Sequence, residues 1–235
     1  MTTPSTTLAS RPEANSAFDY SYKGIYKGIV IGNTSGAIYV DLYNDDKIWA
    51  KLQTDNNETF ILENVPLSES DGKDLTPYFI KFKFANENVS FEIKLDDTGN
   101  NVTVSSFNFF SNKNSKVSLV KERSTSLIKC YTGSFTSMDE TGKINFTSDG
   151  QLKVVGLSKE LNALSFVNIS GEINVISPND VTSKPNNNGE PMNQYLLNAN
   201  LHIGQISGLL NGYKFDGDWM YEESELGSWH ATRIL

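Results

Sequence analysis

Apolar and polar residues alternate with a period of two along most of the chain from Asp19 onward. Over residues 37–43, Ile38, Val40 and Leu42 fall on one side of an extended chain, and the residues between them fall on the other. No window of about 12 residues shows the period of 3.6 that an amphipathic helix requires. The pattern therefore predicts an all-β protein of antiparallel meanders, folded as a barrel or a sandwich.

Two short motifs recur in the same order in the two halves of the chain. The segment at residues 22–26, Tyr-Lys-Gly-Ile-Tyr, is similar to Tyr-Thr-Gly-Ser-Phe at 131–135, and Gly-Ala-Ile at 36–38 is similar to Gly-Lys-Ile at 142–144. The preserved order predicts two tandem β units, with chance similarity between glycine-punctuated strands as the alternative. We expect a disordered tether at residues 1–18, a first β unit at 19–110, a connection at 111–125 and a second β unit at 126–235.

Residues 177–193 lack the sequence pattern of a β-strand. They contain three prolines, at positions 178, 185 and 191, together with a run of asparagines. Proline removes a backbone donor and fixes φ, which breaks a strand ladder. We expect a long surface loop inside the second unit.

The most regular hairpin joins residues 78–84 to residues 89–95, with large apolar side chains on one face of both strands. We expect a tight turn at Asn86–Glu87, aromatic pairs on the buried face and an opposite-charge pair on the wet face. The expected partners are Phe84 with Val89, Phe82 with Phe91, Ile80 with Ile93 and Lys81 with Glu92. A change of parity at Ser105–Ser106 predicts a β-bulge in the following strand.

Charge and cysteine content exclude several classes of function. The net charge is −8 and the basic residues are scattered, which argues against a nucleic-acid partner and against an anionic membrane surface. Cys130 is the only cysteine, so the chain forms no internal disulfide and no cysteine metal cluster. The two histidines, His202 and His230, make a zinc site improbable. We expect no cofactor and no bound metal.

The first fifteen residues are polar, rich in Ser, Thr and Pro, and lack the apolar core of a signal peptide. Two readings remain open: a cytoplasmic protein, or a mature form from which the targeting segment has been removed. We favour the second, because such an arm is typical of a tether that follows a lipid-anchored cysteine. The expected location is then the periplasm or the cell surface.

The chain ends in Gly-Ser-Trp-His-Ala-Thr-Arg at residues 227–233. With the Tyr-Lys-Gly-Ile-Tyr motif and its repeat, this segment resembles small secreted or lipid-anchored β proteins of Bacteroidota-type bacteria. Those proteins carry Gly-x-Tyr/Phe strands and end in Gly-Thr-Trp-x-Gly-x-Arg, so Ala231 departs from the pattern. The strands are also similar, in a general way, to lipocalin-like and streptavidin-like barrels. The resemblance implies a secreted β protein and carries no functional residue over.

We expect a non-enzymatic binding or accessory module with a protein or glycan partner and no catalytic residue. Pairing Val40 with Ala50 places Asp41 opposite Trp49 and leaves aromatic side chains on a face that should be polar. The candidate ligand- or partner-binding residues are Tyr39, Asp41, Tyr43 and Trp49. The second unit covering this face is the competing reading.

Two other functions stay open. The first is a polysaccharide-acting hydrolase with paired carboxylates, whose candidates are Asp41, Asp216, Asp218 and Glu223. The second is a structural subunit of an outer-membrane assembly.

Overall fold

The protein is all-β and consists of two antiparallel sheets of eight strands each. The computed structural model describes residues 8–67, 79–110, 114–137, 140–149, 152–163, 165–176, 194–201, 204–211, 213–221 and 224–235. The only helical segment among them is the 3-10 turn Ser16–Phe18. No helix within these ranges is long and apolar enough to cross a membrane. The predicted fold class is confirmed.

The first sheet is an up-and-down meander that is nearly closed into a barrel. Its strands are β1 (Gly24–Gly32), β2 (Gly36–Leu42), β3 (Ile48–Thr54), β4 (Thr59–Val65), β5 (Ile80–Ala85), β6 (Val89–Leu95), β7 (Thr103–Phe109) and β8 (Ser115–Lys121). β8 pairs with β1, so the sheet runs β7-β6-β5-β4-β3-β2-β1-β8. A seam therefore remains between β7 and β8, which are neighbours in the chain but share no ladder.

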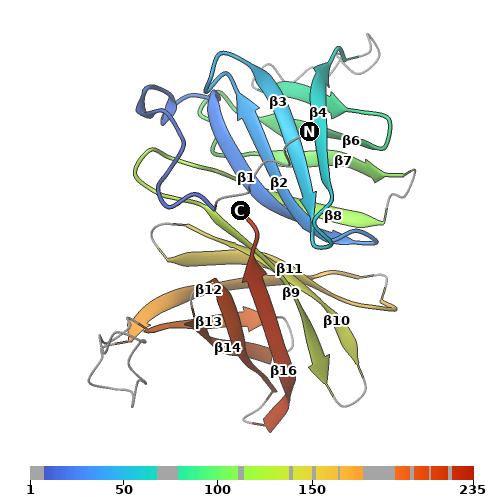
Figure 1. Cartoon of the computed structure of the whole chain (residues 1–235), viewed down its shortest axis with the longest axis vertical. Coiled ribbons are helices and arrows are strands. Elements are labelled where there is room, and N and C mark those ends of the chain that lie inside the picture. Colours follow the sequence, from blue (N-terminus) through green and yellow to red (C-terminus); the bar gives the residue numbers. More distant parts are fainter. Residues whose placement is uncertain are drawn as a thin grey trace.

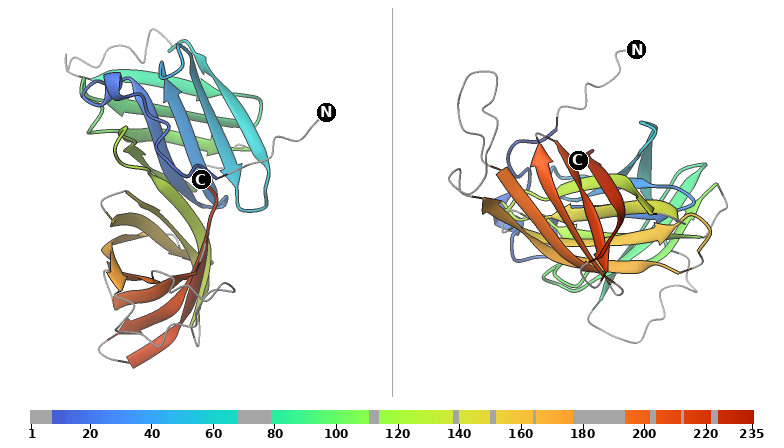
Figure 2. Two further views of the ribbon diagram at one scale, coloured as in Figure 1. Left: turned by 60° about the vertical axis from the view of Figure 1, so that its left-hand side comes forward. Right: turned by 90° about the horizontal axis from the view of Figure 1, so that it is seen from below.

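The second sheet repeats the meander and closes completely. Its strands are β9 (Lys129–Ser137), β10 (Thr141–Ser148), β11 (Lys153–Glu160), β12 (Val167–Ile176), β13 (Gln194–Leu201), β14 (Gly204–Asn211), β15 (Lys214–Tyr221) and β16 (Ser224–Arg233). β9 pairs with both β10 and β16, which removes every free edge. The two barrels are stacked along the long axis of the molecule, with the C-terminus between them (Figure 1), as two further views also show (Figure 2).

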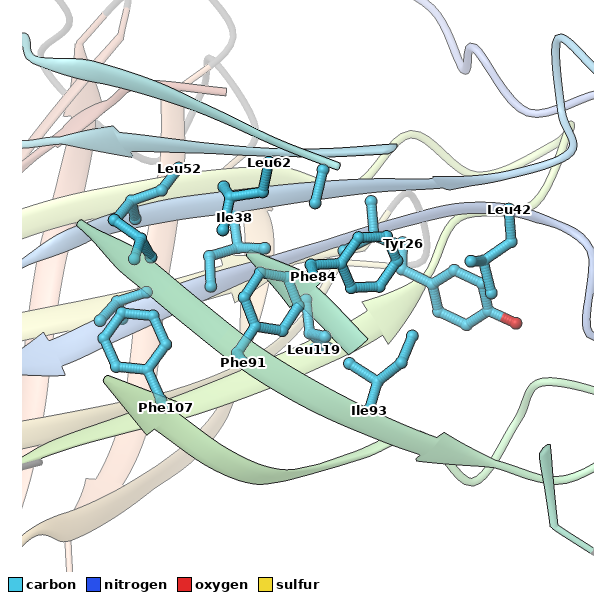
Figure 3. Close-up of a cluster of buried hydrophobic side chains, with 14 of the residues drawn as sticks. Tyr26, Ile38, Leu42, Leu52, Leu62, Phe84, Phe91, Ile93, Phe107 and Leu119 are labelled. Atoms are coloured by element: carbon cyan, nitrogen blue, oxygen red, sulfur yellow. The ribbon is translucent and has the colours of Figure 1, made fainter. Parts of the chain in front are cut away.

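Each barrel has a core of its own, made by the inward side chains of the alternating strands. In the first barrel, Phe84 and Phe91 stack with ring centroids 5.1 Å apart, and Phe107 continues the row (Figure 3). In the second barrel, Tyr131 and Phe146 stack at 4.9 Å, and Phe215 meets both rings edge to face. Burying these aromatic groups supplies the main favourable free energy of each unit.

A third apolar cluster joins the barrels. It consists of outward residues of β1, β2, β9 and β11 and the segment before β9: Ile29, Ile31, Ala37, Ile128, Cys130 and Leu157. Asn145 of β10 adds polar contacts, because its fully buried amide donates to the Val30 carbonyl at 2.5 Å and to Ser35 Oγ at 2.8 Å. The outer face of β1 and β2 is therefore partly an interface between the units.

The predicted hairpin exists, but its register is wrong by two residues. Phe84 lies opposite Phe91, and Phe82 lies opposite Ile93. The cause is Asn86, whose side chain accepts hydrogen bonds from the amides of residues 88 and 89, so the turn is centred on Glu87–Asn88. On the wet face Lys83, rather than Lys81, meets Glu92, at 3.7 Å. A slip of two residues keeps every side chain on its predicted face.

Two other local predictions are confirmed. Val40 lies opposite Ala50, so Asp41 faces Trp49 across β2 and β3. The ladder between β6 and β7 shifts where Glu92 pairs with Ser106 and Ile93 pairs with Val104. Ser105 is the extra residue of the bulge at the predicted change of parity.

The structure aligns the first motif of the internal repeat differently from the sequence comparison. Gly28 pairs with Ile38 in the first barrel, and Gly133 pairs with Ile144 in the second. The segment equivalent to residues 131–133 is therefore Tyr26-Lys27-Gly28, and not the similar Tyr-Lys-Gly four residues earlier. The match of Gly-Ala-Ile to Gly-Lys-Ile is in register as aligned.

Two expected boundaries also change. The middle of the expected connection at 111–125 is strand β8, which pairs with β1 as the last strand of the first sheet. Residues 8–18 are not a free tether: the Ala9 carbonyl accepts from Arg233 at 2.5 Å, and Glu13 binds Lys27 at 2.7 Å. A buried lysine needs a counter-charge, and the arm supplies one. Residues 1–7 and the expected loop at 177–193 lie outside the described residues.

Candidate functional site

A cleft lies on the outer face of β1, β2 and β3, beside the end of β16 and the N-terminal arm. Its space is about 660 Å³, including the part open to solvent. Strand alternation brings its side chains together, because Lys27, Tyr39 and Lys51 form a row across three neighbouring strands. The lining residues are Leu8, Ala9, Glu13, Lys27, Tyr39, Trp49, Lys51, Gln53, Ile234 and Leu235.

Tyr39 and Trp49 form the aromatic wall of the cleft. Their ring centroids are 5.2 Å apart and their planes are inclined by 31°. Both side chains are half-buried. Lys51 places its ammonium 5.7 Å from the centre of the tyrosine ring, so the wall also carries a cation–π contact.

A buried ion cluster lies behind this wall. Lys27 is 1% exposed, and its Nζ lies 2.8 Å from a carboxylate oxygen of Glu122, which is fully buried. Glu122 also accepts hydrogen bonds from the backbone amides of Glu13 at 2.8 Å and Ile128 at 2.9 Å. Glu13 completes the cluster, with its carboxylate 2.7 Å from Lys27 Nζ at the cleft entrance. The cluster ties the arm, β1 and the segment between the barrels together.

The cleft holds its titratable groups in a weakly hydrated environment. Burial raises the pKa of the Tyr39 hydroxyl, and the nearby carboxylate of Glu13 raises it further. Burial lowers the pKa of the Lys51 amine, although Glu13 opposes this shift. Tyr39 therefore remains a neutral hydroxyl that both donates and accepts hydrogen bonds at physiological pH.

Gln53 contributes an unpartnered polar atom to the cleft. The residue is 7% exposed, and its Oε1 forms no hydrogen bond with any described group. A buried acceptor without a partner is uncommon, because it has lost its water without gaining a replacement. A bound ligand with a hydroxyl or amide donor would satisfy it.

Asp41 and Tyr43 do not join this aromatic wall. Asp41 is 2% exposed, and its Oδ1 accepts from the backbone amide of Asn44 at 2.7 Å, so it stabilises the turn between β2 and β3. Burial raises its pKa to about 6. Tyr43 begins that turn with a positive φ of 61°, and the ammonium of Lys23 lies 5.1 Å from its ring centre. The structure brings together Tyr39 and Trp49 of the four predicted residues.

The carboxylates considered for hydrolysis do not converge on the cleft. Asp216 and Asp218 are exposed on the outer face of β15 in the second barrel, whereas Asp41 lies in the first. Glu223 and His202 lie outside the described residues. Ser134 and His230 are in contact, Oγ to Nε2 at 3.2 Å, on the exposed barrel wall. Asp216 is opposite His230 in the ladder, but no hydrogen bond joins these two described side chains.

Two further kinds of candidate group are metal ligands and the thiol of Cys130. Among the described residues, no group of three or more His, Cys, Asp or Glu side chains is placed to hold a metal ion. Burial raises the pKa of the Cys130 thiol to about 12, so it stays protonated inside the interface.

The sequence analysis did not select Lys27, Lys51, Gln53 or Glu13. For Lys27 a signal was present, since it interrupts an otherwise uncharged strand of Gly, Ile, Val and Tyr at residues 24–32. Glu13 and Gln53 carried no such signal, because their positions depend on the path of the arm and on strand order.

No known protein family, no curated protein and no solved structure matches this chain.

Proposed function

We propose that the protein is a non-enzymatic binding module and that its cleft binds a glycan. The supporting observation is the half-buried pair Tyr39–Trp49 in the same cleft as Gln53, whose acceptor oxygen has no partner in the part of the chain that the structure describes. Sugar rings stack their apolar faces on aromatic side chains, while their hydroxyls need several closely spaced donors and acceptors. Lys51, the Tyr39 hydroxyl and the Glu13 carboxylate supply such groups around the aromatic wall.

A titration with defined oligosaccharides tests the proposal. The panel is cellotetraose, chitotetraose and a galacturonic acid tetramer, and the readouts are tryptophan emission and calorimetry. We expect the protein to bind at least one of the two neutral oligosaccharides, cellotetraose and chitotetraose. Trp49→Ala should weaken this binding about tenfold or more, because a stacked aromatic ring contributes up to about 1.5 kcal/mol in addition to its buried area.

Val155→Ala is the matched control. Val155 of β11 occupies the position in the second barrel that Trp49 occupies in the first, and it is exposed on the outer wall outside the cleft. Its substitution should leave oligosaccharide binding unchanged. Equal effects of the two substitutions would contradict the site.

Gln53→Met separates ligand binding from folding. Since Oε1 of Gln53 has no partner among the described residues, its removal breaks no hydrogen bond with them. We expect unchanged or increased stability and a roughly three- to tenfold weaker affinity, the effect of one lost hydrogen bond. Loss of stability together with affinity would mean that the residue only supports the fold.

The rival functions give different results. Release of new reducing ends from the same oligosaccharides would favour a hydrolase. Binding to a partner protein that survives Gln53→Met but not Trp49→Ala would favour a protein interface. Retention in an outer-membrane assembly after high-salt washing would favour a structural subunit.

A periplasmic or cell-surface location, with a lipid anchor, is part of the proposal and rests on the sequence resemblance. Cell fractionation with protease shaving of intact cells tests it, and recovery in the cytosol would contradict it.

A further inference from the structure

The closed barrel has a second pocket, at the mouth where β9, β11, β13 and β15 end. Its space is about 530 Å³, including solvent at the opening. The walls are mainly apolar, with Phe135, Ile206 and Trp219 among them, and Glu160 contributes the charged group. The pocket belongs to the second barrel alone and shares no residue with the cleft described above.

Two glycines create the space for the aromatic walls. A Cβ added to Gly142 would lie 2.4 Å from the Phe135 ring, and one added to Gly204 would lie 3.1 Å from Nε1 of Trp219. The rings therefore occupy the volume of the missing side chains, and they meet edge to face with centroids 5.9 Å apart. Deeper in the barrel, stacked aromatic side chains fill the lumen and close the floor.

The two tryptophans of this barrel differ in the hydrogen bonding of their indole N–H groups. The indole N–H of Trp229 donates to the Ser207 carbonyl at 2.9 Å. The indole nitrogen of Trp219 is buried and has no hydrogen-bond partner among the described groups. A buried donor without an acceptor is unfavourable, so an acceptor atom from a ligand would stabilise the mouth of the barrel.

We propose that this mouth binds a small uncharged ligand with one apolar ring and one hydrogen-bond acceptor. The ring packs between Phe135 and Trp219, and the acceptor takes the free indole N–H. The Glu160 carboxylate disfavours anionic ligands through like-charge repulsion at a poorly hydrated opening. This site does not depend on the proposed glycan cleft.

Three one-ring probes test the proposal: acetophenone, ethylbenzene and benzoate. The readout is the ¹⁵N–¹H resonance of each indole, assigned with Trp49→Phe and Trp219→Phe, in the full chain with its three tryptophans. We expect acetophenone to shift the Trp219 resonance in a saturable way. Ethylbenzene, which lacks the acceptor, should bind roughly three- to tenfold more weakly, and benzoate should be weaker than acetophenone.

Trp219→Phe keeps a ring and removes the donor. In this variant, where the Trp229 indole resonance and calorimetry report binding, the preference for acetophenone over ethylbenzene should disappear, while Trp49→Phe should leave it unchanged. If Trp219→Phe does not fold, Glu160→Gln is the second variant, and it should bring benzoate closer to acetophenone. Equal affinities for acetophenone and ethylbenzene in the unmodified protein would overturn the proposal, as would no shift of the Trp219 resonance with any probe.

Discussion

The two barrels follow the same eight-strand meander, but only the second one closes. In the second barrel β9 pairs on both edges. In the first, β8 pairs with β1 but not with β7, and the bulge at Ser105 lies on the strand that faces the seam. Ser115 at the start of β8 has a buried hydroxyl with no hydrogen-bond partner among the described residues. A bulge twists its strand, and a strand twisted away from its neighbour cannot complete the ladder.

The outer faces of the barrels also differ, position by position. Lys27 corresponds to Thr132, and Tyr39 corresponds to Asn145. The first barrel has charged and aromatic groups where the second has small polar ones that pack in the interface. The same scaffold therefore offers different surfaces for the two sites that we propose, the outer wall in the first barrel and the mouth in the second.

The largest expected difference between the barrels concerns the buried charge. Lys27→Met should lower the free energy of unfolding by about 3 to 5 kcal/mol, because it leaves the fully buried Glu122 without its cation. Thr132→Val, the equivalent change in the second barrel, should cost about 0.5 to 1.5 kcal/mol, the scale of one neutral hydrogen bond, because it leaves no charge unpaired. Urea unfolding followed by circular dichroism measures both values.

The double variant Lys27→Met/Glu122→Leu is the control for this comparison. Removing both charges should recover part of the stability lost by Lys27→Met, since a buried pair contributes little net stability. If the double variant is less stable than Lys27→Met alone, the cluster stabilises the fold through contacts other than charge compensation.

The alternation of side chains was readable in the sequence because it depends only on the two-residue period of a strand. Strand existence, the face of each residue and the bulge at Ser105 followed from it. The register of the hairpin at Phe84 and Phe91 did not, because it was decided by the hydrogen bonds of one side chain, Asn86. Closure of the second barrel could not be predicted either, since the pairing of β9 with β16 joins residues that lie far apart in the sequence.

In the candidate site, too, the sequence predicted the local contacts but not those that depend on distant parts of the chain. Tyr39 and Trp49 were predicted as neighbours from local register alone. Their polar surroundings come from the arm, from Gln53 and from the last residues of the chain. Asp41 was misplaced because alternation gives the face of a side chain but not whether it turns back onto its own backbone.

The second expected difference is the stability cost of an added methyl group in a closed and in an open barrel. Gly28 and Gly133 occupy equivalent places, where an added Cβ would lie 2.0 Å from the Ser118 carbonyl and 1.8 Å from the His230 carbonyl, respectively. Gly133→Ala should cost about 3 kcal/mol, the upper part of the range for overpacking, because a closed ladder cannot widen. Gly28→Ala should cost about 1 kcal/mol, because β8 can move toward the open seam.

Amide hydrogen exchange followed by mass spectrometry separates these effects. Gly133→Ala should speed exchange in β9 and β16, and Gly28→Ala should speed it mainly in β8. Similar costs for the two substitutions would indicate that the seam does not relieve strain.

The smallest expected difference concerns pH. Asp41 of the first barrel corresponds to Thr147 of the second, so only the first barrel titrates at this position. Burial raises the pKa of Asp41 to about 6 from the ordinary value of 3.8, so the folded state binds the proton more tightly than the unfolded state does. Its contribution to stability is present below pH 3.8 and is lost as the pH rises through about 6.

Asp41→Asn isolates this contribution, because an amide oxygen can still accept from the Asn44 amide and does not titrate. Relative to Asp41→Asn, the unmodified protein should lose about 2 kcal/mol of stability between pH 4 and pH 7. Exchange of β2 and β3 amides, measured at several pH values after correction for intrinsic rates, reports this slope, with β10 and β11 as the internal reference. A slope that is the same in both proteins would place the carboxylate in water. In that case Asp41 would be free to face a ligand, and the cleft would extend along β2 to the turn.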